Sequence, residues 1–287
     1  MQTWTVRPEE AGRRLRDILR SSVLLSYSAL KRAKWNGAIL LNGRRTTVDV
    51  RVQPGDRIQV LFPDPVPLYT PRPYPLALKI PFEDDFLLVV DKPAGLACQS
   101  SRNQPEDSLE NAVFSYLSCP DGFIYRPVNR LDKGTGGLMI IAKDGHTQDL
   151  MQKKLHSETF VREYLAMTEG VPEPRAGIID RPIAKADAAS IRREIRPDGK
   201  PARTHYEVVR TLPGFRALVR LRLETGRTHQ IRVHLSSLGC PVCGDFLYGT
   251  ELPEEFPHCF ALHSAFLEFS HPYSGEVIRL KSVPAFC

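Results

Sequence analysis

The sequence lacks features that would place it in several other classes of protein. No apolar run approaches the ~20 residues that a membrane-spanning helix needs, so we expect no membrane partner. The N-terminus carries no apolar secretion core, and we therefore expect no signal peptide. Cysteine is scarce, with six residues in 287. A chain of this length can bury a core without disulfides, so reduced thiols in a cytoplasmic protein are the simpler interpretation.

Two of the cysteines have the spacing of a metal-ligand pair. These are Cys240 and Cys243, and His258 with Cys259 could in principle complete a tetrahedral site. A structural zinc site usually brings a second, similarly spaced ligand pair, whereas His258 and Cys259 are adjacent in sequence. We therefore expect ordinary thiols and no metal.

The composition is that of a globular protein with an uneven distribution of charge. Hydrophobic residues make up 42% of the chain, which excludes disorder. Residues 1–62 hold 12 Lys/Arg and 5 Asp/Glu, whereas the remainder holds 27 and 28. A small basic module beside a near-neutral domain favours binding to a polyanion. A solvated basic face that improves solubility explains this charge equally well.

Proline is concentrated in one stretch, where six prolines fall within residues 63–75. Such a stretch cannot continue a helix or donate to a central sheet ladder, and it favours an extended, semi-rigid spacer. We therefore predict a module at residues 1–62, a linker at 63–76 and a large domain at 77–287.

The first module reads as two basic helices followed by short strands. One helix contains Leu15, Ile18 and Leu19, and a second starts near Ser26 or Ser28 and ends at Gly37. The second helix turns three basic residues toward solvent: Lys31, Arg32 and Lys34. Strands are predicted at residues 38–41, 46–52 and 58–62, with turns at 42–43 and 54–56. This pattern resembles the S4-type RNA-binding module, and the resemblance makes these three cations candidate RNA contacts.

The large domain reads as α+β with a mixed, largely antiparallel sheet. The predicted strands outnumber the helices and show no regular alternation with them. Predicted strands cover residues 86–90, 138–142, 161–167, 205–209 and 215–223. Predicted helices cover residues 146–156 and a segment capped by Thr228.

One aspartate stands out in this domain. Asp132 lies between Arg130 and Lys133, and a run with three glycines and a predicted strand follow it. Neighbouring cations favour an ionised carboxylate, and glycines let a ligand approach the backbone closely. A loop held by a strand is a usual place for a catalytic group. An aspartate-centred turn whose charges simply pair is the alternative.

Four ordered segments resemble a known family. Residues 128–138 (VNRLDKGTGGL) are similar to the catalytic motif of the pseudouridine synthases of the large-subunit ribosomal RNA type, the RluA type. Three further segments match in order: DKPAG at 91–95, VREYLA at 161–166, and GRTHQIRVHL at 226–235 continued by GCPVCGD at 239–245. The resemblance implies an isomerase with the pseudouridine synthase fold and an RNA substrate, ribosomal RNA before transfer RNA.

The resemblance also assigns roles to three residues. Asp132 is the catalytic nucleophile, Arg232 pairs with it, and Tyr164 stacks on the target base. Without the resemblance, Arg232 would be a surface cation and Tyr164 a core residue. In pseudouridine formation the bond between sugar and base moves from N1 to C5 of the uracil ring, and nothing is oxidised. We therefore expect no cofactor. Two routes stay open: attack of Asp132 on C1′ and a glycal-type intermediate.

Two residues before Asp132 are candidate RNA contacts. A stacked uridine must be flipped out of RNA before it can react, and the planar guanidinium of Arg130 can fill the vacated place. Pairing with a phosphate is the alternative for Arg130. Asn129 departs from the family, which commonly has histidine there, and its place beside the path of the flipped base makes it a residue that bears on the choice of substrate. His229 and His234 are interpreted as structural or RNA-facing residues.

These observations predict an RNA uridine isomerase that acts as a monomer. A catalytically silent RNA-binding or ribosome-assembly factor on the same fold is the alternative, although Asp132, Tyr164 and Arg232 are all present. A further alternative is that residues 1–62 bind protein in place of RNA.

Overall fold

The chain divides into two compact units, Met1–Leu68 and Tyr69–Cys287. The computed structural model describes residues 2–23, 25, 27–61, 67, 69–100, 106–155, 157 and 159–286, without the side chains of 2, 28, 29, 32 and 36. The division falls within the stretch predicted as a linker, of which residues 63–66 and 68 lie outside the described residues. No helix in these ranges is long and apolar enough to cross a membrane.

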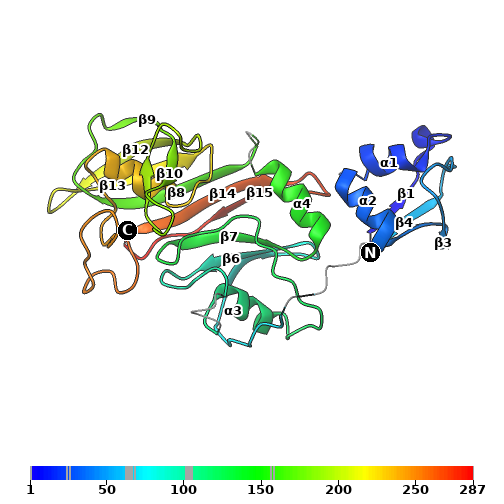
Figure 1. The fold of residues 1–287 in the computed structure, drawn as a ribbon, viewed down its shortest axis with the longest axis horizontal. Coiled ribbons are helices and arrows are strands. Elements are labelled where there is room, and N and C mark those ends of the chain that lie inside the picture. Colours follow the sequence, from blue (N-terminus) through cyan, green and yellow to red (C-terminus); the bar gives the residue numbers. More distant parts are fainter. Residues whose placement is uncertain are drawn as a thin grey trace. The chain divides into compact units, whose positions relative to one another are not determined.

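The first unit is a four-stranded sheet packed against two helices (Figure 1). Its elements are β1 (Gln2–Thr5), a 3₁₀ turn (Pro8–Glu10), α1 (Leu15–Ser21), α2 (Tyr27–Asn36), β2 (Ala38–Leu41), β3 (Arg44–Arg45) and β4 (Arg57–Leu61). The strand order is β1-β4-β2-β3, and all pairings are antiparallel. Leu15, Ile18 and Leu19 are fully buried, as their helical spacing requires. The S4-type identity of this unit stays a prediction.

One strand predicted for the first unit is wrong. Only Arg44–Arg45 form a strand there, and residues 46–52 make turns and a single bridge. The alternation of Val48, Val50 and Val52 suggested a strand. Their carbonyls instead accept hydrogen bonds from the amides of Arg16, Leu15 and Gly12. The segment therefore caps the start of α1 in place of extending the sheet.

The second unit is an α+β domain with a largely antiparallel sheet, as predicted, and that sheet has nine strands. The strand order is β5-β6-β7-β14-β8-β13-β12-β9, with β15 beside β14. Among the strands that the structure describes in this sheet, only β7 and β14 pair in parallel. The strands are β5 (Lys79–Glu83), β6 (Leu87–Lys92), β7 (Gly136–Ala142), β8 (Val161–Glu169), β9 (Ala176–Asp180), β12 (Arg203–Leu212), β13 (Arg216–Leu223), β14 (Leu262–Ser270) and β15 (Val277–Lys281). A separate hairpin joins β10 (Ile183–Lys185) to β11 (Arg193–Ile195).

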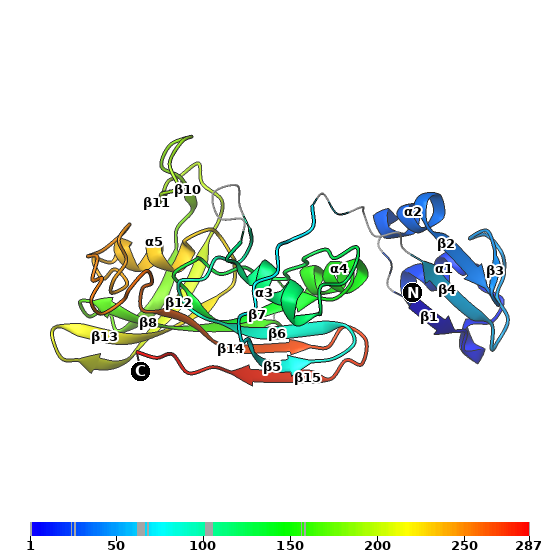
Figure 2. The ribbon, with the colours of Figure 1, turned by 90° about the horizontal axis from the view of Figure 1, so that it is seen from below.

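Three helices pack on this sheet: α3 (Leu109–Tyr116), α4 (Gly145–Lys154) and α5 (Gln230–Ser237). Because side chains alternate along β6 and β7, one face of this pair packs on α3 and the other on α4. Figure 1 shows the two helices on either side of these strands. The β10–β11 hairpin projects from the sheet beside α5, as Figure 2 shows. This arrangement places α5 beside the segment that carries Asp132.

Two local predictions for this unit are wrong. Thr228 does not cap α5; His229 holds the N-cap position in a left-handed conformation (φ 57°). The side-chain oxygen of Gln230 stabilises this entry by accepting hydrogen bonds from the Arg227 amide and the Thr225 hydroxyl. Phe215, predicted to begin a strand, lies outside β13 with 77% of its surface exposed, because it occupies a turn with φ 56°.

Candidate active site

The loop that carries Asp132 is tied to the sheet on the side of β7. The Val128 amide donates to the carbonyl of Ile140, and the Ile140 amide donates to Oδ1 of Asn129, both at 2.8 Å. The Thr135 amide then donates to the carbonyl of Asp132 (3.1 Å) and closes a turn. The Asp132 carboxylate therefore stands on a short segment whose two ends are hydrogen-bonded.

Lys92 fixes the other side of this loop. Its side chain is 1% exposed, and its Nζ donates to the carbonyls of Pro93 (3.0 Å), Leu96 (2.8 Å) and Lys133 (3.3 Å). Burial lowers the pKa of Lys92 to about 8, although the charges of Cys98 and Asp132 oppose that shift. The turn that follows β6 is thereby clamped to the residue next to Asp132.

Glycine is required at two positions around the loop. Gly137 has φ 104°, and a Cβ there would lie 2.3 Å from the backbone of Ser264 on β14. A Cβ on Gly134 would lie 2.5 Å from the ring of Phe260. The glycine-rich run thus lets β7 approach β14 and lets an aromatic ring pack under the loop.

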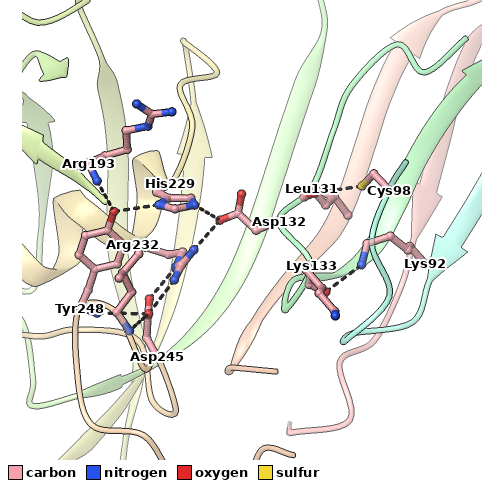
Figure 3. Close-up of polar contacts among 11 residues, drawn as sticks. Lys92, Cys98, Leu131, Asp132, Lys133, Arg193, His229, Arg232, Asp245 and Tyr248 are labelled. Atoms are coloured by element: carbon pink, nitrogen blue, oxygen red, sulfur yellow. Dashed lines mark hydrogen bonds and ion pairs between the residues drawn. The ribbon is translucent and has the colours of Figure 1, made fainter. Parts of the chain in front are cut away.

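A buried arginine holds the Asp132 carboxylate. Arg232 on α5 donates from Nη1 to Oδ2 of Asp132 at 3.0 Å. Its Nε and Nη2 donate to the two oxygens of Asp245 at 2.7 and 2.8 Å (Figure 3). Asp245 is fully buried, whereas a quarter of the Asp132 side chain is exposed. Asp245 therefore fixes the guanidinium, which presents an N–H of Nη1 to the partly exposed carboxylate of Asp132.

Aromatic rings complete the surroundings of Arg232. Its guanidinium carbon lies 4.3 Å from the ring centroid of Phe260 and 5.0 Å from that of Tyr248. Burial disfavours the charged form, yet the hydrogen bonds and charges of Asp245 and Asp132 outweigh it, so the pKa of Arg232 is raised. The cation is held permanently charged and in one orientation.

His229 approaches Asp132 from the other side. Its Nε2 lies 4.0 Å from Oδ2 of Asp132, and its Nδ1 lies 2.8 Å from the Tyr248 hydroxyl. That hydroxyl accepts the backbone amide of Arg193 on β11 (2.8 Å), so it can donate its own proton to Nδ1. Burial lowers the pKa of His229, against the opposing charge of Asp132. With Nδ1 accepting from Tyr248, the Nε2–H of His229 is directed toward Asp132.

The Asp132 carboxylate lines a cleft of about 540 Å³. Tyr164 on β8 forms part of its wall with 6% of its surface exposed, and burial raises the pKa of its phenol. Asn129 and Arg130 line the same cleft. Asn129 is buried, and its Nδ2 has no hydrogen-bond partner in the described part of the chain, whereas Arg130 is exposed.

The structure thus brings together five of the residues singled out in the sequence: Asn129, Arg130, Asp132, Tyr164 and Arg232. Lys31 and Lys34 belong to the first unit, where both are exposed on α2. The side chain of Arg32 lies outside the described residues. The roles assigned to all eight residues stay predictions.

Sequence reasoning gave no active-site role to Asp245, Tyr248 or Lys92. Asp245 lies at the end of the segment GCPVCGD, which is similar to the family motif. An acidic residue at that place was the sequence feature that could have pointed to it. His229 was read only as structural or RNA-facing.

The cysteines form no metal site in the described ranges, where no group of three or more His, Cys, Asp or Glu side chains could hold a metal ion. Cys240 and Cys243 are both buried. Burial raises the pKa of Cys243 to about 12. These two thiols therefore pack as apolar groups.

Comparison with known proteins identifies the family. The RNA pseudouridylate synthase family profile matches residues 86–237. An uncharacterized RNA pseudouridine synthase of Bacillus subtilis, YlyB, is 32% identical over 97% of this chain and 92% of its own length. Ribosomal large subunit pseudouridine synthase D of Nitrosomonas europaea is 34% identical over 97% of this chain and 83% of its own. The chain belongs to the RNA pseudouridylate synthase family.

Solved structures agree with this assignment. Human RNA pseudouridylate synthase domain containing 4 is 26% identical and has a TM-score of 0.57, over 72% of this chain and 89% of its own. Human RNA pseudouridylate synthase domain containing 1 shares the fold, with 24% identity and a TM-score of 0.59 over 74% and 85%. Within the family this chain is of the RluA type, and it is an isomerase that acts on RNA.

Proposed function

We propose that this chain converts specific uridines of ribosomal RNA to pseudouridine, with Asp132 as the nucleophile. The observation that carries the proposal is the Asp132–Arg232 ion pair at the cleft, held from behind by the buried Asp245. A fixed cation beside a partly exposed carboxylate holds that carboxylate in one orientation, which a nucleophile requires. Relatives with the name ribosomal large subunit pseudouridine synthase D support ribosomal RNA over transfer RNA as the substrate.

The reaction proceeds in two displacements at one carbon. A carboxylate oxygen of Asp132 bonds to C1′ while the N1–C1′ bond breaks. The electron pair of the broken bond leaves with uracil on N1. The freed base turns within the cleft, and C5 then bonds to C1′ and expels Asp132 as a carboxylate. The C5 proton is lost and N1 gains a proton, which restores the uracil ring. Charges balance throughout, and nothing is oxidised.

The cleft offers groups for the flipped base. Tyr164 presents a rigid ring on which uracil can stack. The exposed guanidinium of Arg130 stands at the cleft two residues before Asp132, where it can occupy the place that the base vacates. Nδ2 of Asn129 is an unused donor for RNA. These groups offset the few kcal/mol that flipping costs.

The first unit acts as an S4-type RNA-docking module in this proposal. Lys31 and Lys34 are exposed on α2, which also exposes Tyr27 (74%) and Trp35 (71%). The Nζ of Lys34 lies 5.6 Å from the Trp35 ring centroid. Exposed cations next to exposed rings suit phosphates and unpaired bases.

Replacing Asp132 with asparagine tests the proposal. The Asp132→Asn variant removes the nucleophile and should slow pseudouridine formation more than about 1,000-fold, with RNA binding retained. Pseudouridines are mapped in ribosomal and transfer RNA from cells whose own gene is deleted and which express either the native protein or the Asp132→Asn variant. Asp121→Asn, at an exposed turn, is the matched control and should behave as the native protein. Full activity of the Asp132→Asn variant would show that Asp132 is not the nucleophile. Pseudouridines that depend on the gene in transfer RNA alone would show that ribosomal RNA is not the substrate.

A further inference from the structure

One buried arginine beside the active site has no role in the reaction described above. Arg162 lies on β8 two residues before Tyr164, so the two side chains share one face of the strand. Both residues line the cleft of Asp132. Two residues along a strand span about 6.8 Å, so both side chains can contact one bound nucleotide.

Arg162 is a buried cation that has no counter-charge among the residues that the structure describes. It is 4% exposed, and its Nε has no hydrogen-bond partner in the described part of the chain. Burial lowers the pKa of its guanidinium, and only the Tyr164 phenol opposes the shift. The contrast is Arg232 in the same cleft, which is held by two carboxylates. Leaving a buried charge unpaired is strongly destabilising, and such a group points to a ligand that supplies the partner.

The guanidinium faces the loop between β13 and α5. A Cβ on Gly226 would lie 3.1 Å from Nη1 of Arg162, so glycine leaves room for this group. Gly226, Arg227 and Thr228 line the active-site cleft and also a second cavity of about 440 Å³. The basic residues of that cavity outnumber its single acid, Asp198, and are Lys185, Arg193, Lys200 and Arg227. An RNA strand that leaves the active-site cleft over residues 226–228 would therefore enter a positively charged cavity.

We propose that Arg162 and the loop at residues 226–228 bind a backbone phosphate of the RNA next to the target uridine. The inference rests on the proposed function, because it requires a uridine in the cleft. A phosphate supplies both the negative charge and the paired acceptors that a guanidinium recognises. A uracil carbonyl accepts the same hydrogen bonds but is neutral, and it would leave the buried charge uncompensated.

The test replaces Arg162 with methionine, which has a similar length and no charge. Single-turnover pseudouridine formation is measured on ribosomal RNA from cells that lack the gene, at several enzyme and salt concentrations. We expect the enzyme concentration at half-maximal rate to rise about tenfold or more at low salt. Its logarithmic salt dependence should fall by about 0.7 to 0.9, the contribution of one phosphate contact. The maximal rate should stay within about threefold.

Two control variants and one stability measurement separate this role from others. Arg222→Met removes an exposed charge from β13 and should leave the salt dependence unchanged. Arg162→Lys keeps a cation at this position and should retain part of the salt dependence that Arg162→Met loses. The RNA-free Arg162→Met protein should unfold at the same or a higher temperature, because an unpaired buried charge is gone.

Three outcomes would overturn the phosphate site. The first is an unchanged salt dependence, and the second is a loss confined to the maximal rate, which would place the contact on the base. The third is a lower unfolding temperature, which would make Arg162 structural. Failure of the proposed function is distinguishable, because the native enzyme would then form no pseudouridine or Asp132→Asn would stay active.

Discussion

The two units of the chain treat charge in opposite ways. Residues 1–68 hold 12 Lys/Arg and 6 Asp/Glu, and Glu10 is the one buried charged residue among their described side chains. Residues 69–287 hold 27 of each, yet they bury charges around the cleft: Lys92, Arg162, Arg232 and Asp245. Exposed charges are screened by water and salt, beyond a Debye length of about 8–10 Å at physiological salt, whereas buried charges are screened less and interact more strongly with the groups they contact. The first unit is therefore suited to attracting a polyanion and the second to orienting one reacting group.

The largest expected effect on stability comes from removing a buried charge in the second unit. Asp245→Asn leaves the Arg232 guanidinium without its bidentate partner and should reduce the free energy of unfolding by about 3–5 kcal/mol. The rate should also fall at least about 100-fold, because Arg232 would no longer be fixed beside Asp132. Urea unfolding and single-turnover assays measure the two effects.

An exposed acid of the first unit provides the matched comparison. Asp49 lies 3.0 Å from Arg16, with about half of each side chain exposed. Asp49→Asn should change the free energy of unfolding by less than about 1 kcal/mol, because water screens the pair. Equal losses from Asp49→Asn and Asp245→Asn would remove the distinction between the units.

A smaller effect is expected from deleting residues 1–68. The protein that remains should bind ribosomal RNA about tenfold more weakly at low salt, and its affinity should depend less on salt. The maximal single-turnover rate should stay within about threefold, because the cleft belongs to the second unit. An unchanged affinity and salt dependence would show that the basic unit does not dock RNA.

The smallest effect concerns pH. All eight histidines lie in the second unit, and burial lowers the pKa of His229, His234 and His263. Below their unfolded value of about 6.5, the unfolded chain binds protons that the folded chain does not, so stability falls as pH falls. Each histidine contributes at most about 1.4 kcal/mol per pH unit.

Urea unfolding of residues 69–287 and of residues 1–68 between pH 7 and 5.5 measures this difference. The larger fragment should lose stability as the pH falls, and the smaller, which has no histidine, should not. Equal slopes for the two fragments would contradict the assignment to buried histidines.

Much of the fold was predictable from local patterns. The apolar run in β7 and the helical spacing in α5 predicted their elements, because each buries a continuous face. The alternation in β14 is interrupted by a bulge between Ser264 and Phe266, so that strand was missed. Residues 46–52 alternate without forming a strand, because their carbonyls bond the start of α1.

The candidate site was predictable only through resemblance. Asp132 and Arg232 are 100 residues apart, and no local pattern pairs them. The family segments brought them together, and the structure has the ion pair. The role of Asp245 in holding Arg232 could not be predicted from the sequence. It depends on the complete burial of Asp245 against the guanidinium, which the tertiary fold creates. The left-handed backbone of His229 likewise depends on the packing of Gln230.

The sharing of Arg232 between two carboxylates has a consequence for the whole catalytic cycle. When Asp132 becomes an ester in the proposed reaction, its negative charge disappears, yet Arg232 keeps both hydrogen bonds to Asp245. The cation is then neither stranded nor released to move. When the ester breaks, the returning carboxylate meets a donor that never changed position. The site therefore needs almost no reorganisation between its free and covalent states, which lowers the barrier in both directions.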